Sequence, residues 1–485
     1  MLPPFNIRQW DRVRAAHLLN RAGFGGAPED IDALHALGFE RGVDSLVKGV
    51  DDSEQFPKPE WAQPLNRFAL RMEARELSQE ERKLKFDEIQ KQDREHQMAL
   101  IAWWLGRMRF TLNPAREKLT LFWHGHFATS AEKVKNPYMM WLQNETLRRL
   151  GMGSFADLTK AVARDPAMMV FLDTDRSRKL RPNENFAREL MELFTLGIGN
   201  YSEEDIKEAA RAFTGFKFND ADQTFRFAEL QQDDGEKVFM GKRGKFVGDD
   251  IVDIIMAQPQ CARFIVSKLW TFYAYENPES ALVENLAADY RKSGYNTAAL
   301  LRAIFQSSAF YGERAIRSQI KSPVQFVIAL SRGLDVGLPP APALSGIMRQ
   351  LGQIPFLPPS VKGWDGGKAW ITTASLLNRY NLANFALGNG TMEIERRGKK
   401  RAANGPREIK IRKGPDLQEI APTELRAKPQ ELIASLYWRL FNAPLDPKHA
   451  APFEKFLSGK KMPLDDASLR ELMHLMASTP QFQLT

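Results

Sequence analysis

Reactive side chains are most concentrated between Asn183 and Gly197, where three glutamates, an arginine and two asparagines occur within fifteen residues. At about 100° per residue, most of these polar side chains fall on one half of a helix and the apolar ones fall on the other half. The pattern therefore predicts an amphipathic helix over 184–196. Glu189 and Glu192 lie three residues apart, which makes them neighbours on the surface of that helix.

Two neighbouring carboxyl groups can share acid and base catalysis. In glycoside hydrolysis the two groups stand about 5–9.5 Å apart, a separation that this spacing can reach. A carboxyl group kept protonated by burial or by a like charge would donate to the leaving group, while its ionised neighbour activates water. We therefore take Glu189 and Glu192 as the candidate catalytic pair, with Arg188 to moderate their repulsion and Asn185 as a substrate contact. The alternative is a solvated helix face with an ion pair between Arg188 and Glu192.

A second group of candidates surrounds His124-Gly125-His126, at the end of a predicted helix over 114–127. Two histidines so close suggest a metal site, but residues i and i+2 of a helix point about 200° apart, and no His-Glu-x-x-His pattern supplies a third ligand. The pair converges only if Gly125 ends the helix, and the alternatives are a role beside the catalytic groups or structural hydrogen bonding. Glu117 and Glu184 are reserve carboxylates for catalysis.

A turn-rich loop over 358–370 contains two tryptophans, Trp364 and Trp370, with glycines between them. Indole rings in such loops stack on the apolar faces of sugars or on peptides, and packing against the following helix is the alternative. Arg379, in the predicted helix over 373–387, adds hydrogen-bond donors. We therefore expect these three residues, together with the two histidines, to contact the substrate.

Helical signals run along the whole chain. Pro28 followed by acidic residues, with Gly38 at the end, delimits a short helix, and Ser78 with Glu81 forms a capping box before a long one. Alternating apolar and polar residues predict a small β insertion at about 216–247. Helix pairs recurring every 30 to 50 residues or so suit a mainly α fold, a helical (α/α) barrel or toroid. Further helices are expected over 136–150, 155–164, 203–213, 249–257, 259–275, 279–292, 297–306, 322–334, 428–440 and 466–476.

The positive charge of the chain is local. Between 396 and 413 there are nine basic residues and one acidic residue, so 9 − 1 = +8 accounts for the whole net charge of +8. Interspersed glycines and a proline indicate a surface loop, and no aromatic residue lies inside it to stack on bases, so no nucleic-acid partner is expected. We divide the chain into a helical core over 1–390, a basic flexible loop over 391–415 and a C-terminal helical segment over 416–485.

Composition and motifs exclude several other classes of protein. No run of about 18 apolar residues predicts a membrane span, and residues 1–10 lack the pattern of a secretory signal. If a signal was removed, the protein is exported, and otherwise it is cytoplasmic. The single cysteine, Cys261, excludes an internal disulfide framework. Phosphate-loop, dinucleotide, nucleophile-elbow and calcium-loop patterns are absent, so no cofactor is expected.

Several segments spread along the chain carry distinctive sequence patterns. They are His17-Leu18-Leu19-Asn20-Arg21-Ala22-Gly23-Phe24-Gly25, Arg116 to Thr129, Asn183 to Gly197, Tyr201 to Asp205, Ala209 to Gly215, Lys268-Leu269-Trp270, Lys321-Ser322-Pro323 and Pro358 to Trp370. Together, and in this order over most of the chain, they resemble one bacterial family, the domain of unknown function 1800. Gly125 and Phe194 depart from the residues expected there, which are asparagine and histidine.

The resemblance implies a function as well as a fold. Most members have no assigned activity, many are predicted to be exported, and a sulfatase-like partner protein is often encoded beside them. Some relatives resemble mucin-degrading enzymes with a helical barrel and a two-glutamate site. We therefore expect a metal-independent hydrolase of glycans or O-glycosylated proteins that uses Glu189 and Glu192. The alternatives are a non-catalytic scaffold or export-associated binding protein, and a metalloenzyme that uses His124, His126 and a glutamate.

Overall fold

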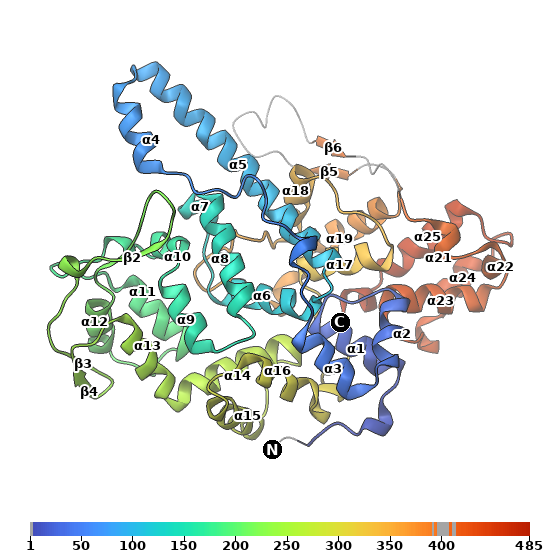
Figure 1. Ribbon diagram of the computed structural model, residues 1–485. Coiled ribbons are helices and arrows are strands. Elements are labelled where there is room, and N and C mark those ends of the chain that lie inside the picture. The colour runs from blue at the N-terminus through green and yellow to red at the C-terminus, as the bar shows by residue number, and fades with distance from the viewer. Residues whose placement is uncertain (1–2, 390–391, 395–406, 410–413) are drawn as a thin grey trace.

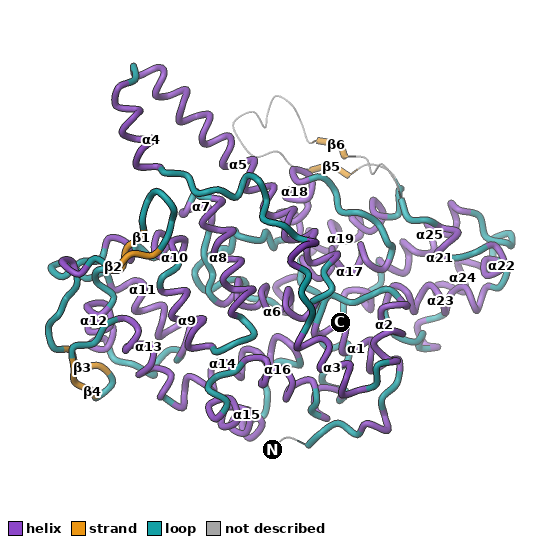
Figure 2. The backbone as a smooth tube through the Cα atoms, in the orientation of Figure 1, coloured by secondary structure: helices purple, strands orange, loops and turns teal. Residues whose placement is uncertain are grey.

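The protein is described by a computed structural model, shown as a ribbon in Figure 1. The described residues are 3–389, 392–394, 407–409 and 414–485, and side chains between 390 and 413 lie outside the description. Helices dominate the chain, and the strands are short (Figure 2). The prediction of a mainly α fold with a small β insertion is confirmed.

Twelve α-helices precede the β insertion in the described part of the chain. They are α1 (Arg12–Ala22), α2 (Pro28–Ala36), α3 (Phe39–Lys48), α4 (Arg67–Glu73), α5 (Gln79–Phe110), α6 (Pro114–His126), α7 (Ala131–Val134), α8 (Pro137–Leu150), α9 (Phe155–Ala163), α10 (Pro166–Phe171), α11 (Glu184–Glu189) and α12 (Glu203–Ala212). The longest of them, α5, begins at the predicted capping box, where the Glu81 carboxylate accepts a hydrogen bond from the Ser78 backbone N–H at 3.0 Å. With α4 it forms an arm that projects from the body (Figure 1).

The β insertion consists of two antiparallel hairpins. In the first, Phe216 pairs with Phe227 and Phe218 with Phe225. The first hairpin lies beside α10 and the second beside α12, both at one end of the molecule (Figure 1). The strands of the described residues are β1 (Phe216–Phe218), β2 (Phe225–Phe227), β3 (Lys237–Phe239), β4 (Lys242–Gly244), β5 (Met392–Ile394) and β6 (Arg407–Ile409).

The helices after the insertion complete the two apolar cores of the molecule. They are α13 (Gly248–Ala257), α14 (Pro259–Tyr273), α15 (Ser280–Lys292), α16 (Thr297–Phe305), α17 (Pro323–Gly333), α18 (Ala341–Leu351), α19 (Thr373–Ala386), α21 (Leu417–Ile420), α22 (Thr423–Arg426), α23 (Pro429–Phe441), α24 (Ala451–Leu457) and α25 (Asp466–Ala477). One core joins α1–α3 and α6 to α9–α16. The other joins α5 to α17–α19 and α21–α25.

The C-terminal helices therefore pack with α5 and α17–α19 in one core, and the division of the chain at 391–415 stays a prediction. Most of the basic segment over 396–413 lies outside the described residues, so its role also stays a prediction. Within the described ranges, no helix is both long and apolar enough to cross a membrane, in agreement with the sequence.

Candidate functional site

The predicted acidic helix is present, but it changes from an α-helix to a π-helix after Glu189. Asn183 caps α11, because its side-chain oxygen accepts a hydrogen bond from the Asn185 backbone N–H at 2.9 Å. After Glu189 the chain continues as a π-helix, η5 (Leu190–Thr195). The sequence pattern predicted one regular helix over 184–196, and the structure differs in this wider turn. Short π-helical segments inside helices are frequent at functional sites.

The arginine of this helix forms its ion pairs with glutamates other than the catalytic candidates. Arg188 makes a two-pronged ion pair with Glu203 of α12, with both N···O distances 2.9 Å, and it also reaches Glu184 at 3.3 Å. The ion pair between Arg188 and Glu192 that the sequence offered as an alternative is replaced by these two pairs. Asn185 is exposed beside them.

Glu189 and Glu192 lie in different surroundings. The Glu192 carboxylate accepts a hydrogen bond from the Tyr201 hydroxyl at 2.8 Å. The Glu189 carboxylate accepts no hydrogen bond from any described residue, and its side chain is half-buried. Burial raises the pKa of Glu189, the charge of Glu192 raises it further, and Arg188 partly offsets both. The pair therefore consists of one carboxyl group whose pKa is raised and one that accepts a hydrogen bond from a phenol.

The end of the π-helix is anchored by two basic side chains from other elements. His126 Nε2 lies 2.9 Å from the Phe194 carbonyl oxygen, which can only accept, so Nε2 carries the proton. Lys268 of α14 donates to the Leu193 carbonyl at 3.1 Å and to His126 Nδ1 at 3.2 Å. Burial and the charge of Lys268 hold the pKa of His126 well below its ordinary value, so the ring is neutral. These contacts satisfy carbonyls that a helix leaves open at its C-terminus.

His124 points to a different part of the core. Its Nε2 atom accepts a hydrogen bond from the Phe356 backbone N–H at 2.9 Å, and burial lowers the pKa of His124 to about 3. Its ring lies 5.1 Å from that of Trp104 and 5.9 Å from that of Trp364. The two histidines thus serve separate contacts. Among the described residues, no group of three His, Cys, Asp or Glu side chains could hold a metal ion.

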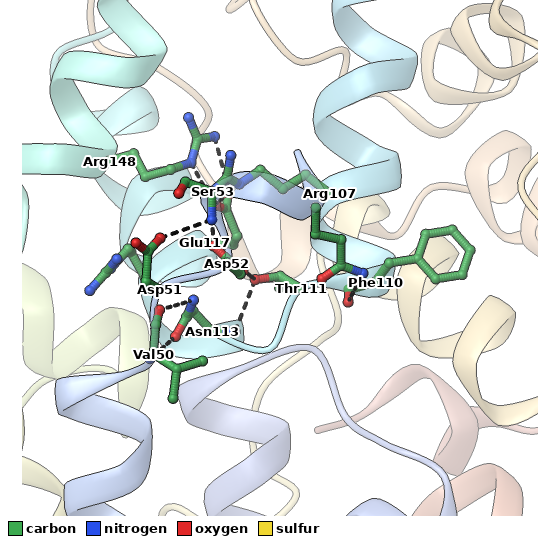
Figure 3. A network of polar contacts seen from close by, with 12 residues as sticks. Val50, Asp51, Asp52, Ser53, Arg107, Phe110, Thr111, Asn113, Glu117 and Arg148 are labelled. Carbon is green, nitrogen blue, oxygen red and sulfur yellow. Dashed lines mark hydrogen bonds and ion pairs between the residues drawn. The ribbon is translucent and has the colours of Figure 1, made fainter. Parts of the chain in front are cut away.

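Glu117 lies in a closed network of buried polar side chains (Figure 3). Its carboxylate accepts hydrogen bonds from Trp104 Nε1 at 2.8 Å, from Arg107 Nε at 2.8 Å, and from Arg148 Nε and Nη2 at 2.5 and 3.0 Å. Burial raises its pKa, but the charges of the two arginines outweigh burial and leave the pKa of Glu117 below its ordinary value. Asp52 extends the network by accepting from Arg107 at 3.1 Å.

The remaining substrate-contact candidates differ in their exposure to solvent. Trp364 is half-buried on its loop, whereas Trp370 is buried. Arg379 is fully buried, donates to the Lys321 carbonyl at 2.8 Å, and lies over the Phe326 ring. No hydrogen bond or ion pair among the described residues links either glutamate of the pair to the two tryptophans.

The structure therefore brings together one cluster, the glutamate pair with its partner Tyr201, and beside it the anchoring residues His126 and Lys268. It places Glu117, His124 and Arg379 in separate buried networks. Sequence reasoning assigned no function to Tyr201 or to Lys268. Both residues lie in segments that carry the family resemblance, which was the signal available for finding them.

The fold and these segments place the chain in a protein family whose function is unknown. A family model described as "Protein of unknown function (DUF1800)" matches residues 17–484. The chain belongs to this family. No curated protein and no solved structure matches it.

Proposed function

We propose that this protein is a metal-independent hydrolase of glycans or O-glycosylated proteins, with Glu189 as general acid and Glu192 as general base. The observation that carries the proposal is the unequal environment of the two glutamates. Enzymes that use paired carboxyl groups as acid and base place the two groups in different surroundings, and burial and a like charge raise the pKa of one member, as they do for Glu189.

The roles follow from the contacts of each carboxyl group. Glu189 has no hydrogen-bond donor among the described residues to stabilise its ionised form, and its pKa is raised, so we assign it as the proton donor to the leaving group. Glu192 accepts a hydrogen bond from the Tyr201 hydroxyl, which orients its carboxylate, and we assign it as the acceptor for a proton of water. The water oxygen then bonds to the substrate carbon while the leaving group departs with the proton of Glu189. This balance holds for a glycosidic and for a peptide bond alike.

Other side chains have supporting roles in the proposal. Tyr201 orients Glu192, and the ion pairs of Arg188 with Glu184 and Glu203 fix the helix that carries both glutamates. Trp364, which is half-buried, is the indole available to stack on a sugar or peptide. The buried positions of Glu117 and Arg379 favour structural roles for these two residues.

The two alternatives make different demands on the same residues. A non-catalytic scaffold would use the acidic helix for ion pairs, and Arg188 does pair with Glu184 and Glu203, but neither Glu189 nor Glu192 takes part. A metalloenzyme would need His124 and His126 to converge with a glutamate, and their ring nitrogens instead bond to separate partners. The hydrolase is therefore the function that we develop.

The test is cleavage of a panel of mucin-type O-glycosylated proteins by the parent, by Glu189→Gln and by Glu192→Gln. Product from the parent alone is the expected result. Glu204→Gln is the matched control, because Glu204 is an exposed glutamate on the neighbouring helix α12 and, among the described residues, its one ion pair is with Lys207. It should cleave as the parent does.

The other outcomes are equally informative. Equal cleavage by the parent and both variants would move catalysis to other residues. Absence of cleavage by the parent over a broad panel would favour the scaffold. Stoichiometric zinc or iron in the purified protein would overturn the metal-independent mechanism.

A further inference from the structure

Lys268 has an unusual set of partners for a charged side chain at the edge of a core. The ammonium group has three N–H donors, and the Leu193 carbonyl and His126 Nδ1 receive two of them. No third acceptor is found among the described residues, and no carboxylate oxygen of those residues lies within 4.0 Å of Nζ. The Phe264 ring lies 4.7 Å away. The ammonium thus keeps one donor without a partner and has no full counter-charge.

The charge of a second lysine also acts on Lys268. Lys362 is exposed on the 358–370 loop, and its charge adds to burial in lowering the pKa of Lys268 to about 8. Its own ion pair, with Asp365 at 2.8 Å, is exposed and therefore weak. Two lysines that repel each other without a shared carboxylate are unfavourable in the free protein. A bound anion would remove that repulsion.

The loop that carries Lys362 is fixed against α6. Gly363 follows Lys362 and has a φ of +84°, and a Cβ added there would stand 2.3 Å from the Gly125 carbonyl oxygen. The glycine therefore allows the loop backbone to rest directly on the C-terminal turn of α6. The backbone next to Lys362 is therefore fixed against the helix turn that carries His126, which is a hydrogen-bond partner of Lys268.

Space is available at the same place. A Cβ added at Gly125, which directly precedes His126, would meet no atom within 4 Å. Two lysines and a region of open space therefore adjoin the C-terminal turn of α6. The backbone of the π-helix that carries Glu192 borders it, because Leu193 is the residue that accepts the hydrogen bond of Lys268.

Three other buried cations differ from Lys268. Arg107 and Arg148 share the Glu117 carboxylate, so their charge is neutralised inside the protein. Lys118 has no carboxylate partner among the described residues, but it is fully buried, bonds to the Gly23 carbonyl and is closed to any ligand. Of these four cations, Lys268 is the one that is half-buried. The C-terminal end of the π-helix contributes only partial negative charge.

We propose that Lys268 and Lys362 form a binding site for an oxyanion, a carboxylate or a sulfate ester carried by the glycan of the substrate. The proposal rests on the proposed function for the identity of the substrate, but the site itself follows from the contacts of Lys268. Lys268 would donate its free N–H to the anion, and Lys362 would add charge from the loop. Bound there, an acidic sugar would lie next to the helix that carries the glutamate pair.

The experiment follows the lysine side chains directly, without turnover. Protein labelled with ¹³C at lysine Cε is titrated by NMR in sodium chloride, and then in sodium sulfate or N-acetylneuraminic acid at matched ionic strength. The Lys268 signal is assigned by its loss in Lys268→Gln. We expect sulfate or the carboxylated sugar to raise the pKa of Lys268 by about one unit, which corresponds to about tenfold tighter binding to the protonated form. The two arms show which oxyanion the site prefers.

Matched variants separate a site from general ionic effects. Lys268→Gln should weaken binding at least about tenfold, as expected for loss of a charge-assisted hydrogen bond, and Lys362→Gln about two- to fivefold. The signal of Lys207, an exposed lysine paired with Glu204, should not respond to either anion beyond its response to chloride.

A Lys268 pKa that is the same in chloride, sulfate and the carboxylated sugar would overturn this proposal. That outcome is distinguishable from failure of the proposed function. If the glutamate variants still abolish cleavage, the hydrolase stands without an anion site. If anions bind but no glycoprotein is cleaved, the site stands without the hydrolase.

Discussion

Removal of the Glu117 charge should destabilise the protein far more than removal of an exposed glutamate. Glu117→Gln keeps the size of the side chain but leaves Arg107 and Arg148 buried with less counter-charge, since these residues are 6% and 4% exposed. Breaking a buried ion pair by removing one partner costs about 3–5 kcal/mol. Arg107 retains Asp52 and Arg148 retains Glu145, so the lower half of this range is expected.

Thermal unfolding measures this cost. A chain of 485 residues has an unfolding entropy of about 1 kcal/mol/K, so a loss of about 3–4 kcal/mol should lower Tm by about 3–4 °C. The control is Glu184→Gln, because Glu184 is 43% exposed in its pair with Arg188 and should change the free energy of unfolding by less than about 1 kcal/mol. Equal, small changes in Tm for both variants would refute the assignment of Glu117 to a stabilising network.

The same network predicts a pH dependence. The pKa of Glu117 is lower in the folded protein than its ordinary value, so its ionised form contributes stability above the unfolded-state pKa. That contribution is lost as the pH falls through the folded-state pKa. The parent should therefore lose more stability on acidification than Glu117→Gln, and the difference between their Tm values should narrow in acid. A constant difference at all pH values would contradict this reasoning.

Three further predictions concern single residues. Gly363→Ala should lower the free energy of unfolding by at least about 2 kcal/mol, because φ is positive at this position and the new Cβ would clash with the Gly125 carbonyl. Gly125→Ala should be neutral or stabilising by up to about 1 kcal/mol, because its new Cβ would meet no atom within 4 Å. A Tm lower for Gly125→Ala than for Gly363→Ala would contradict this reasoning. Cys261 is fully buried and its pKa is raised to about 12 by burial, so it should react with a thiol reagent only after unfolding. Because the charge of Glu192 helps to raise the pKa of Glu189, carboxyl NMR should find that pKa lower in Glu192→Gln than in the parent, and no change would show that the pair is uncoupled.

Much of the fold could be predicted from local sequence patterns. The helices with clear caps and apolar periodicity were found within a few residues, as for α6, α14 and α19. The chain around α1 was noted only as a motif, although Asp11 caps this helix. No helix was predicted over α18, although it has a proline in its first turn, where proline is common.

The candidate site was harder to predict because it depends on tertiary contacts. The side chains that anchor the π-helix come from α6 and α14, 68 and 75 residues away from the carbonyls that they contact. Likewise, the arginines that neutralise Glu117 lie on α5 and α8, so the sequence of α6 alone could not predict these ion pairs. Local periodicity placed Glu189 and Glu192 together, and only the structure distinguishes their surroundings.

The central claim, that these two glutamates add water across a bond of a glycosylated substrate, is tested most directly with ¹⁸O-labelled water. Mass spectrometry of an O-glycoprotein digest would show ¹⁸O in a released sugar or in a new peptide carboxylate, and so would also identify the bond. We predict labelled product from the parent and none from the double variant Glu189→Gln, Glu192→Gln. Labelled product formed by both at equal rates would contradict the account.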